Sequence, residues 1–250
     1  MVKAGEKNKR TSEVRGLPIG LVVLFCIFAG LFLFLRSPFF SIREFRVQGN
    51  VRVSRDEIIA RAGQDTANIF AFDVDKASRL IALSPWIEKV SVRRVLPGTI
   101  AIRVTERTPI AFTPARNGMW LVDASGRVLG QDDGSFAGLI AITGPLADLA
   151  PGQFLDASTY GWGLRVLAAL GPLSRQKLTE VSVQDSEVAL ILDDGCTVLI
   201  GEEKADAGPV SALLESILQD LSKQGRVASR IDLRFEKPVV KEQFQKASER

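Results

Sequence analysis

The sequence predicts an α+β protein in which one apolar N-terminal helix precedes two mixed domains. Three observations support this fold class. An uncharged apolar run covers residues 17–35. Residues 37–106 follow the order strand, helix, helix, strand, strand. Residues 107–241 combine hairpin signals with helical patterns, which predicts a second α+β domain with an antiparallel sheet.

The apolar run, LPIGLVVLFCIFAGLFLFL, has the length of a membrane helix. At ~1.5 Å rise per residue it just crosses a bilayer core of ~30 Å. Residues 1–16 are rich in lysine and arginine, and such residues stay on the cytoplasmic side. We therefore expect a cytoplasmic tail at 1–16, one transmembrane helix at 17–35 embedded in the lipid bilayer, and an extracytoplasmic body.

A cleaved secretory signal is the alternative explanation of this N-terminus. The apolar run is longer than a typical signal core of ~7–15 residues. Its exit, FLFLRSPFF, lacks the small residues that signal peptidase requires. Both features favour an uncleaved anchor.

The composition argues against several function classes. The chain has no histidine, which removes His-based triads, most zinc sites and the usual general base. Its two cysteines, Cys26 and Cys196, fall in the apolar run and in the body, so a disulfide framework is excluded. Most of the net charge of +3 belongs to the tail, which gives no case for nucleic acid. Asp123 and Asp193-Asp194 fit turns better than a catalytic carboxylate pair. We expect no enzymatic activity, cofactor or metal.

The elements of the first segment follow from local signals. A capping box, Ser54 to Glu57, begins one helix and Asp73 begins the next. Leu96-Pro97-Gly98 joins two alternating strands as a hairpin. The predicted strands are 42–47, 90–93 and 100–104.

The second segment contains two hairpins, around Ala-Ser-Gly at 124–126 and around Asp-Asp-Gly at 193–195. Helices are predicted at 158–170 and 210–221, the second ended by Gly225. A short buried strand is predicted at 139–142, and a closing strand at 229–235 that residues 238–240 can extend. Residues 242–250 are polar and are expected to form a flexible end.

The closing strand allows two interpretations. It carries charged residues on one face and is followed by Pro238, and proline within a sheet is confined to an edge. A sheet edge offers unpaired backbone groups to another chain. The strand is therefore either a docking edge or an edge protected by its charges. Phe235 lies in phase with Ile231 and Leu233, so it belongs either to an interface or to the core.

Four stretches together resemble the FtsQ/DivIB family of bacterial cell-division proteins. They are SPFFSIREFRVQGNVRVSRDEI, SPWIEKVSVRRVLPGTIAIRVTERTPIA, MWLVDASGRVL and RVASRIDLRF, in this order. The unit at 37–106 is similar to a POTRA domain, most specifically in PWIEKVSVRRVLPGTIAIRV. The resemblance implies a non-enzymatic scaffold of the divisome, anchored in the inner membrane at the division septum, with a periplasmic body.

The resemblance also implies partners and a site. The partners are FtsB, FtsL and other septal cell-wall synthesis proteins. In this family the last strands pair with a strand of FtsB, although Pro238 departs from the pattern and leaves the register open. The recruitment residues implied in the POTRA-like unit are Asp75 and Arg79. The partner-binding residues implied are Arg230, Ile231, Asp232, Leu233, Arg234, Phe235, Glu236, Lys237, Pro238, Val239 and Val240.

One alternative function also uses POTRA-like units. A component of a secretion or outer-membrane assembly system contains several such units or a β-barrel. This chain shows a single unit and no barrel pattern, so the scaffold is the favoured interpretation.

Overall fold

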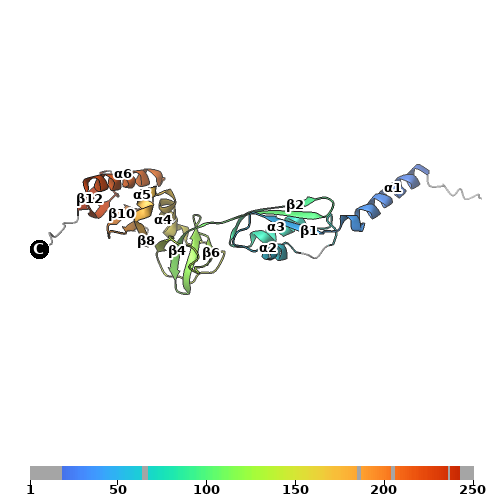
Figure 1. Cartoon of the computed structure of the whole chain (residues 1–250), viewed down its shortest axis with the longest axis horizontal. Coiled ribbons are helices and arrows are strands. Elements are labelled where there is room, and N and C mark those ends of the chain that lie inside the picture. The colour runs from blue at the N-terminus through green and yellow to red at the C-terminus, as the bar shows by residue number, and fades with distance from the viewer. Residues whose placement is uncertain (1–18, 64–66, 185–186, 204–205, 236, 243–250) are drawn as a thin grey trace, which may run out of the picture.

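The structure, a computed structural model, describes residues 19–63, 67–184, 187–203, 206–235 and 237–242. The predicted tail at 1–16, Glu236 and residues 243–250 of the predicted flexible end lie outside the described residues. The described chain is elongated, with an N-terminal helix at one end, a small domain in the middle and a larger domain at the other end (Figure 1).

The N-terminal helix, α1, covers Ile19–Leu35. Within the described ranges, no helix combines the length and apolarity needed to cross a membrane. A short 3-10 helix, η1 (Pro38–Phe40), follows it. The Phe34 ring meets the Phe40 ring edge-on at 5.3 Å, and the Asn68 side chain donates to the carbonyl of Leu35 (2.9 Å). These contacts fix the end of α1 against the small domain.

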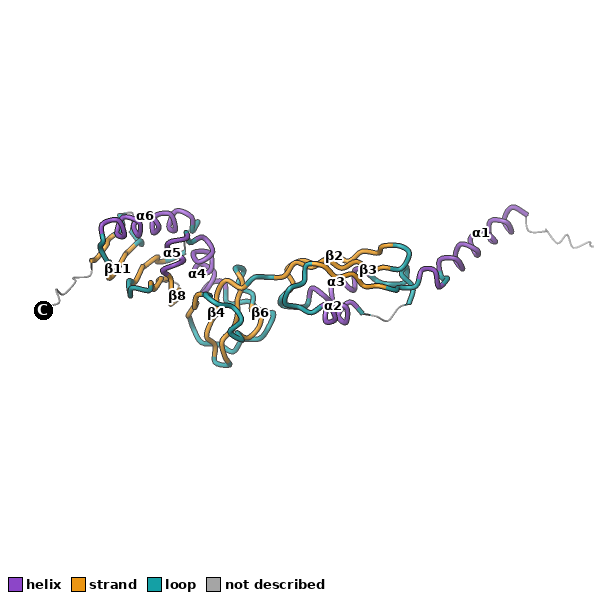
Figure 2. The backbone as a smooth tube through the Cα atoms, in the orientation of Figure 1, coloured by secondary structure: helices purple, strands orange, loops and turns teal. Residues whose placement is uncertain are grey.

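The first domain has the predicted order of elements. They are β1 (Glu44–Gln48), α2 (Arg55–Ala62), α3 (Val74–Ala82), β2 (Ile87–Val95) and β3 (Thr99–Glu106). The sheet order is β1-β3-β2, with β1 parallel and β2 antiparallel to β3. Both helices cover one face of this sheet (Figure 2).

The predicted helix starts at Ser54 and Asp73 are confirmed, but only the serine half of the capping box forms among the described hydrogen bonds, since the Glu57 carboxylate accepts from Arg61 instead. The Ser54 hydroxyl accepts from the Glu57 amide (3.1 Å), and Gly63 ends α2 at a φ of 82°, where a side chain is disfavoured. The Asp73 carboxylate accepts from the amides of Asp75 and Lys76. The fully buried side chains of the core include Ile58, Ile69, Ile81, Ile100 and Ile102.

The second domain is built on a nine-stranded sheet in the order β12-β11-β10-β9-β8-β7-β4-β5-β6. Helices α4 (Ala157–Ala169), α5 (Pro172–Lys177) and α6 (Gly208–Gln224) lie together beside it (Figure 2). The strands are β4 (Pro109–Ala115), β5 (Gly118–Asp123), β6 (Val128–Gln131), β7 (Ile140–Thr143), β8 (Leu178–Gln184), β9 (Glu187–Leu192), β10 (Thr197–Gly201), β11 (Ala228–Asp232) and β12 (Val239–Glu242).

The prediction of an antiparallel sheet is corrected by the strand directions. β7 pairs in parallel with both β4 and β8, and β10 pairs in parallel with β11. For the β7–β8 and β10–β11 pairs the cause is a helical crossover, α4–α5 in the first and α6 in the second, because a chain that returns through a helix re-enters the sheet in the same direction. The two predicted hairpins are confirmed as β5–β6 and β9–β10.

The core of the second domain lies between the helices and the sheet. Trp120 and Trp162 are buried in it, as their apolar surroundings predict. Trp86 is half-buried and stacks on Phe136, with 6.0 Å between the ring centres, so it joins the two domains. Gly225 ends α6 in the left-handed region at a φ of 62°, as predicted.

Candidate docking edge of the second domain

The last two strands form one edge of the nine-stranded sheet. β11 pairs in parallel with β10 on one side and antiparallel with β12 on the other. β12 is therefore the outermost strand, and its outer side pairs with no strand among the described residues. The free edge of the sheet is therefore the outer side of the Val239–Glu242 backbone.

The prediction of one closing strand that residues 238–240 extend is wrong. The chain ends β11 at Asp232, turns, and returns as β12 with Ile231 opposite Val240. The turn begins where the Asp232 carboxylate accepts from the Arg234 amide (3.1 Å), a local bond that competes with strand pairing. Pro238 lies immediately before β12, outside the residues that pair with β11. Its missing amide hydrogen therefore removes no hydrogen bond between the two strands.

The implied partner-binding residues divide into three groups. Arg230, Ile231 and Asp232 lie on β11, which is paired on both sides, and Leu233 continues its pairing by donating to the carbonyl of Leu199 (2.8 Å). Ile231 and Leu233 are core residues. Arg234, Phe235, Lys237 and Pro238 lie in the turn, while Glu236 is outside the described residues. Only Val239 and Val240 lie on the free edge.

The side chain of Phe235 is 61% exposed, so it does not belong to the core despite its phase with Ile231. The Arg234 guanidinium lies 5.8 Å from the centre of its ring. An exposed aromatic side chain beside an unpaired strand is typical of a protein-binding surface.

Charges near this edge are partly neutralised within the chain. Arg234 donates to Asp232 (2.8 Å), a bond that lowers the pKa of Asp232, and lies 3.6 Å from Glu187. Arg226 forms an ion pair with Glu242 at the end of β12. Lys237 and Lys241 are exposed and make no ion pair among the described residues. The charge left over on the edge strand is therefore positive.

Lys241 and Glu242 belong to the free edge, although the sequence-based range stopped at Val240. The sequence changes from apolar to charged residues after Val240, which suggested that the strand ends there. An edge strand can carry charged residues on both faces, so this change does not mark its end. No group of three or more histidine, cysteine or acidic side chains is placed to hold a metal ion in the part of the chain that the structure describes.

Asp75 and Arg79 lie in the first domain, away from β12. Both side chains are exposed on α3, one helical turn apart. The structure therefore presents two separate candidate surfaces, one in each domain.

Comparison with known proteins identifies both domains. Residues 40–107 match the family model of the FtsQ-type POTRA domain, and residues 111–234 match that of the C-terminal part of cell division protein FtsQ/DivIB. The two matches cover the strands from β1 to β11 apart from the first two residues of β4.

Individual relatives agree with these family models. The chain is 36% identical to cell division protein FtsQ of Rhizobium meliloti over 119 residues, which are 47% of this chain and 38% of that protein. It is 27% identical to cell division protein FtsQ of Myxococcus fulvus over 239 residues, 91% of this chain and 81% of that one. The chain thus spans less than half of the first relative and about four fifths of the second.

A solved structure, the major extracytoplasmic domain of DivIB from Geobacillus stearothermophilus, matches 48% of this chain and 97% of its own length. Its sequence identity is 17% and its TM-score 0.32. Both domain matches and the relatives agree on one assignment. The chain belongs to the FtsQ/DivIB family of cell-division proteins.

Proposed function

We propose that this protein is a non-enzymatic scaffold of the divisome that binds FtsB- and FtsL-type partners outside the cytoplasm and links them to septal peptidoglycan synthesis. One observation carries the proposal: the nine-stranded sheet ends in β12, whose outer side is unpaired among the described residues. Binding by strand addition uses such an edge, because the partner's backbone completes the ladder.

The neighbourhood of the edge favours a partner strand that carries acidic residues. Lys237 and Lys241 supply positive charge that forms no ion pair with any described residue, and Phe235 supplies an exposed ring beside the strand. In strand addition, the backbone bonds supply affinity while side chains such as these set register and specificity.

The proposal includes an uncleaved membrane anchor at residues 17–35. The side chains of α1 are apolar on every side of the helix, and none of them is buried by the protein. Phe25 and Phe28 are both more than 60% exposed, which is costly in water and favourable in lipid. Protease added to spheroplasts should digest the body and spare the tail; a mature N-terminus beyond Arg36 would contradict the anchor.

We also propose that Asp75 and Arg79 contribute to recruitment to the division site. The Arg79→Glu variant should lose septal localisation while its melting temperature stays unchanged. Arg103→Glu is the matched control, because Arg103 is exposed on the sheet strand β3 rather than on α3. Equal localisation of the two variants would place the recruitment surface elsewhere.

Docking at β12 is tested with proline substitutions at adjacent positions, Val239→Pro and Val240→Pro. Successive amides along a strand point to opposite sides. One variant should lose a bond to β11 and melt at a lower temperature. The other should keep its melting temperature and bind an FtsB-type partner at least ~10-fold more weakly, about 1.4 kcal/mol.

Phe235→Ala gives an independent side-chain test. Loss of an aromatic anchor at an interface commonly costs about 2 kcal/mol, which is a ~30-fold loss of affinity. Since the side chain is exposed, the free energy of unfolding should not change. Wild-type affinity in Phe235→Ala and in both proline variants would reject β12 as the docking edge.

A further inference from the structure

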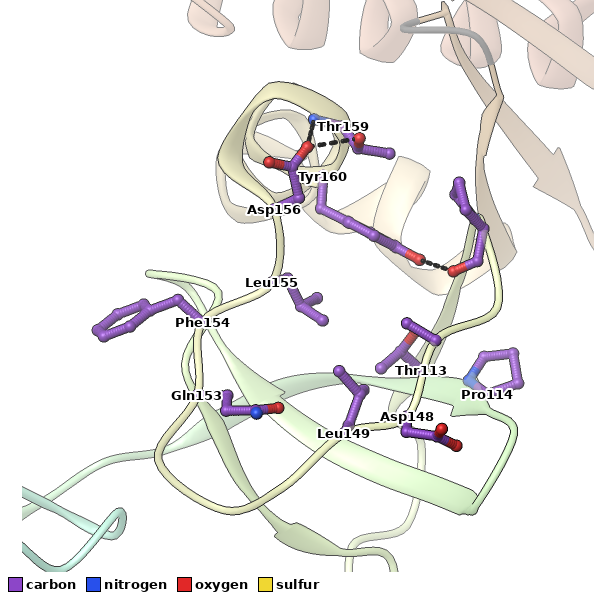
Figure 3. A pocket seen from close by; sticks show the side chains of 12 residues that line it. Thr113, Pro114, Asp148, Leu149, Gln153, Phe154, Leu155, Asp156, Thr159 and Tyr160 are labelled. Atoms are coloured by element: carbon purple, nitrogen blue, oxygen red, sulfur yellow. Dashed lines mark hydrogen bonds between the residues drawn. The ribbon is translucent and has the colours of Figure 1, made fainter.

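A cavity of about 450 Å³ opens in the second domain where β4 and β7 separate (Figure 3). These strands pair only at Ala111–Ile140 and Phe112–Ala141. Beyond this point β4 continues with Thr113 and Pro114, and proline has no amide hydrogen to donate. The sheet is therefore split at this point, and the loop after β7 and the start of α4 form the remaining walls.

The walls of the cavity are mainly apolar. Figure 3 shows Leu149, Leu155 and Thr113 facing the interior, below the ring of Tyr160. The side chain of Phe154, which also lines the cavity, is more than half exposed. Such an exposed apolar residue at a cavity provides contact area for the flanks of a bound polypeptide.

One buried polar side chain in the wall has an acceptor oxygen that no described residue uses. Thr113 is 1% exposed, and its hydroxyl accepts no hydrogen bond within the described residues. The Tyr160 hydroxyl donates its proton to the carbonyl of Pro145 (3.1 Å). Burial raises the pKa of Tyr160, while the neighbouring Thr113 side chain interacts with the Tyr160 hydroxyl and lowers this pKa less strongly. The lone pairs of the Thr113 hydroxyl therefore remain available to a donor of a ligand.

The charged residues that line the cavity are both acidic. Asp156 is engaged at the start of α4, where it accepts from the amide and the hydroxyl of Thr159 at 2.8 and 2.6 Å. Asp148 is exposed at the rim and makes no ion pair or hydrogen bond with any described residue. The free charge at the rim is therefore negative and complements a cation.

We propose that this cavity binds a tryptophan or tyrosine side chain of a partner polypeptide, followed in the partner by a lysine or arginine that pairs with Asp148. These two aromatic side chains combine an apolar ring with an N–H or O–H donor, which matches apolar walls and the acceptor oxygen of Thr113. Four strands, β8 to β11, separate β7 from β12 in the sheet, so this site is distinct from the docking edge and goes beyond the proposed function.

The test uses the full chain in detergent micelles and a fluorescein-labelled peptide, acetyl-Gly-Ser-Trp-Lys-Gly-Ser-amide, followed by fluorescence anisotropy. We expect saturable binding. Replacing the peptide's tryptophan by alanine should weaken binding at least ~10-fold, and replacing its lysine by glutamate about threefold at low salt. Asp148→Asn should remove the difference between the lysine and glutamate peptides.

Two variants of the protein locate the binding site. Ala147→Phe fills the mouth of the cavity from an exposed position and should abolish saturation, whereas the control Ala168→Phe, exposed on α4 outside the cavity, should not. Thr113→Val should weaken binding about threefold with little change in melting temperature, because it removes the acceptor oxygen and keeps the side-chain shape. Absence of saturation in the wild type, or saturation that survives Ala147→Phe, overturns the proposal. Phe235→Ala should leave this binding unchanged, which separates the two sites.

Discussion

Asp123 holds the end of β5 through both of its carboxylate oxygens. One oxygen accepts from the Arg107 guanidinium (2.7 Å), and the other accepts from the amides of Ser125 and Arg127 (both 2.9 Å). Burial raises the pKa of Asp123, but the bonds from Ser125 and Arg107 outweigh it and hold the pKa below its usual value. A single residue thus connects the β5–β6 turn to the segment that joins the two domains.

We predict that Asp123→Ala destabilises the protein by about 3–5 kcal/mol, because the change leaves a largely buried guanidinium without its partner. Denaturant unfolding monitored by tryptophan fluorescence measures the loss. The control is Asp193→Ala, in the exposed β9–β10 turn, where an ion pair at 3.8 Å contributes little. Equal losses in the two variants would contradict the role assigned to Asp123.

The turn functions of Asp123 and of Asp193-Asp194 could be predicted from the sequence, because an aspartate at a turn bonds to amides two to four residues away. The partner Arg107 could not be predicted. It lies 16 residues from Asp123, and the contact exists only because β4 and β5 pair. Likewise, the alternation of Ile231, Leu233 and Phe235 suggested that Phe235 is buried on the same face as the other two. Phe235 is exposed because the strand ends at Asp232, so the alternation no longer determines which way its side chain points.

At the scale of elements, α5 is held by a carboxylate from another helix. Glu215 of α6 accepts from the amides of Leu173 and Ser174 at 2.9 and 3.0 Å, at the start of α5, and also from the Ser174 hydroxyl. The Ser174 bond is the main cause that lowers the pKa of Glu215. Gly171, which precedes α5, has no side chain with which to cap the helix, so the cap comes from a distant element.

We predict that Glu215→Gln lowers the free energy of unfolding by about 1–2 kcal/mol at pH 7, since bonds to a charged group are stronger than neutral ones. A carboxylate whose folded pKa is lowered stabilises the fold above its unfolded pKa, ~4.3, and this contribution disappears as pH falls through the folded pKa. The difference between wild type and variant should therefore shrink below about pH 4. Asp220→Asn, exposed on the same helix, is the control and should leave the free energy of unfolding at pH 7 nearly unchanged. A difference that is constant with pH would rule out the capping role.

The sequence predicted most elements whose signals are local, including the first domain, two hairpins and α6. It did not predict β4, α5 or β8. β4 contains two prolines, and proline in a sequence usually indicates the end of a strand. Both prolines lie outside the two positions at which β4 pairs with β7, so their missing amide hydrogens do not disturb that pairing. The order of the strands could not be predicted either, because it depends on crossovers through α4–α5 and α6. The candidate docking edge is therefore β12 rather than the whole predicted range Arg230–Val240.

At the scale of the whole molecule, one set of side chains links the two domains beside their short connection. Arg52 of the first domain donates to Asp133 (2.6 Å) and Ser135 (2.8 Å) of the second. Its guanidinium also lies 4.5 Å from the centre of the Trp86 ring, which stacks on Phe136. Exposed ion pairs and single ring contacts are weak, so this link biases the relative orientation of the domains rather than fixing it.

We predict that Arg52→Ala broadens the distribution of distances between the domains while each domain keeps its fold. Spin labels at Ser78 and Ser216, in a Cys26→Ala background, report this distance by pulsed electron spin resonance. The control is Arg61→Ala, whose ion pair with Glu57 lies within α2. A bond from Ser135 lowers the pKa of Asp133 to about 2, so Asp133 stays ionised and keeps its ion pair with Arg52 from ~pH 5 to 8. The distribution of distances in the wild type should therefore be constant over this pH range. A distribution unchanged by Arg52→Ala would exclude the link.

The parallel pairing of β1 with β3 has a mechanical consequence. The chain enters the first domain through β1 on the side of α1 and leaves it through β3 at the opposite end (Figure 1). A pulling force between α1 and the second domain therefore acts on the two strands from opposite ends and shears them. The five paired positions of Glu44–Gln48 and Thr99–Arg103 then resist together instead of opening one after another. The first domain therefore has the strand geometry that resists tension applied along the molecule.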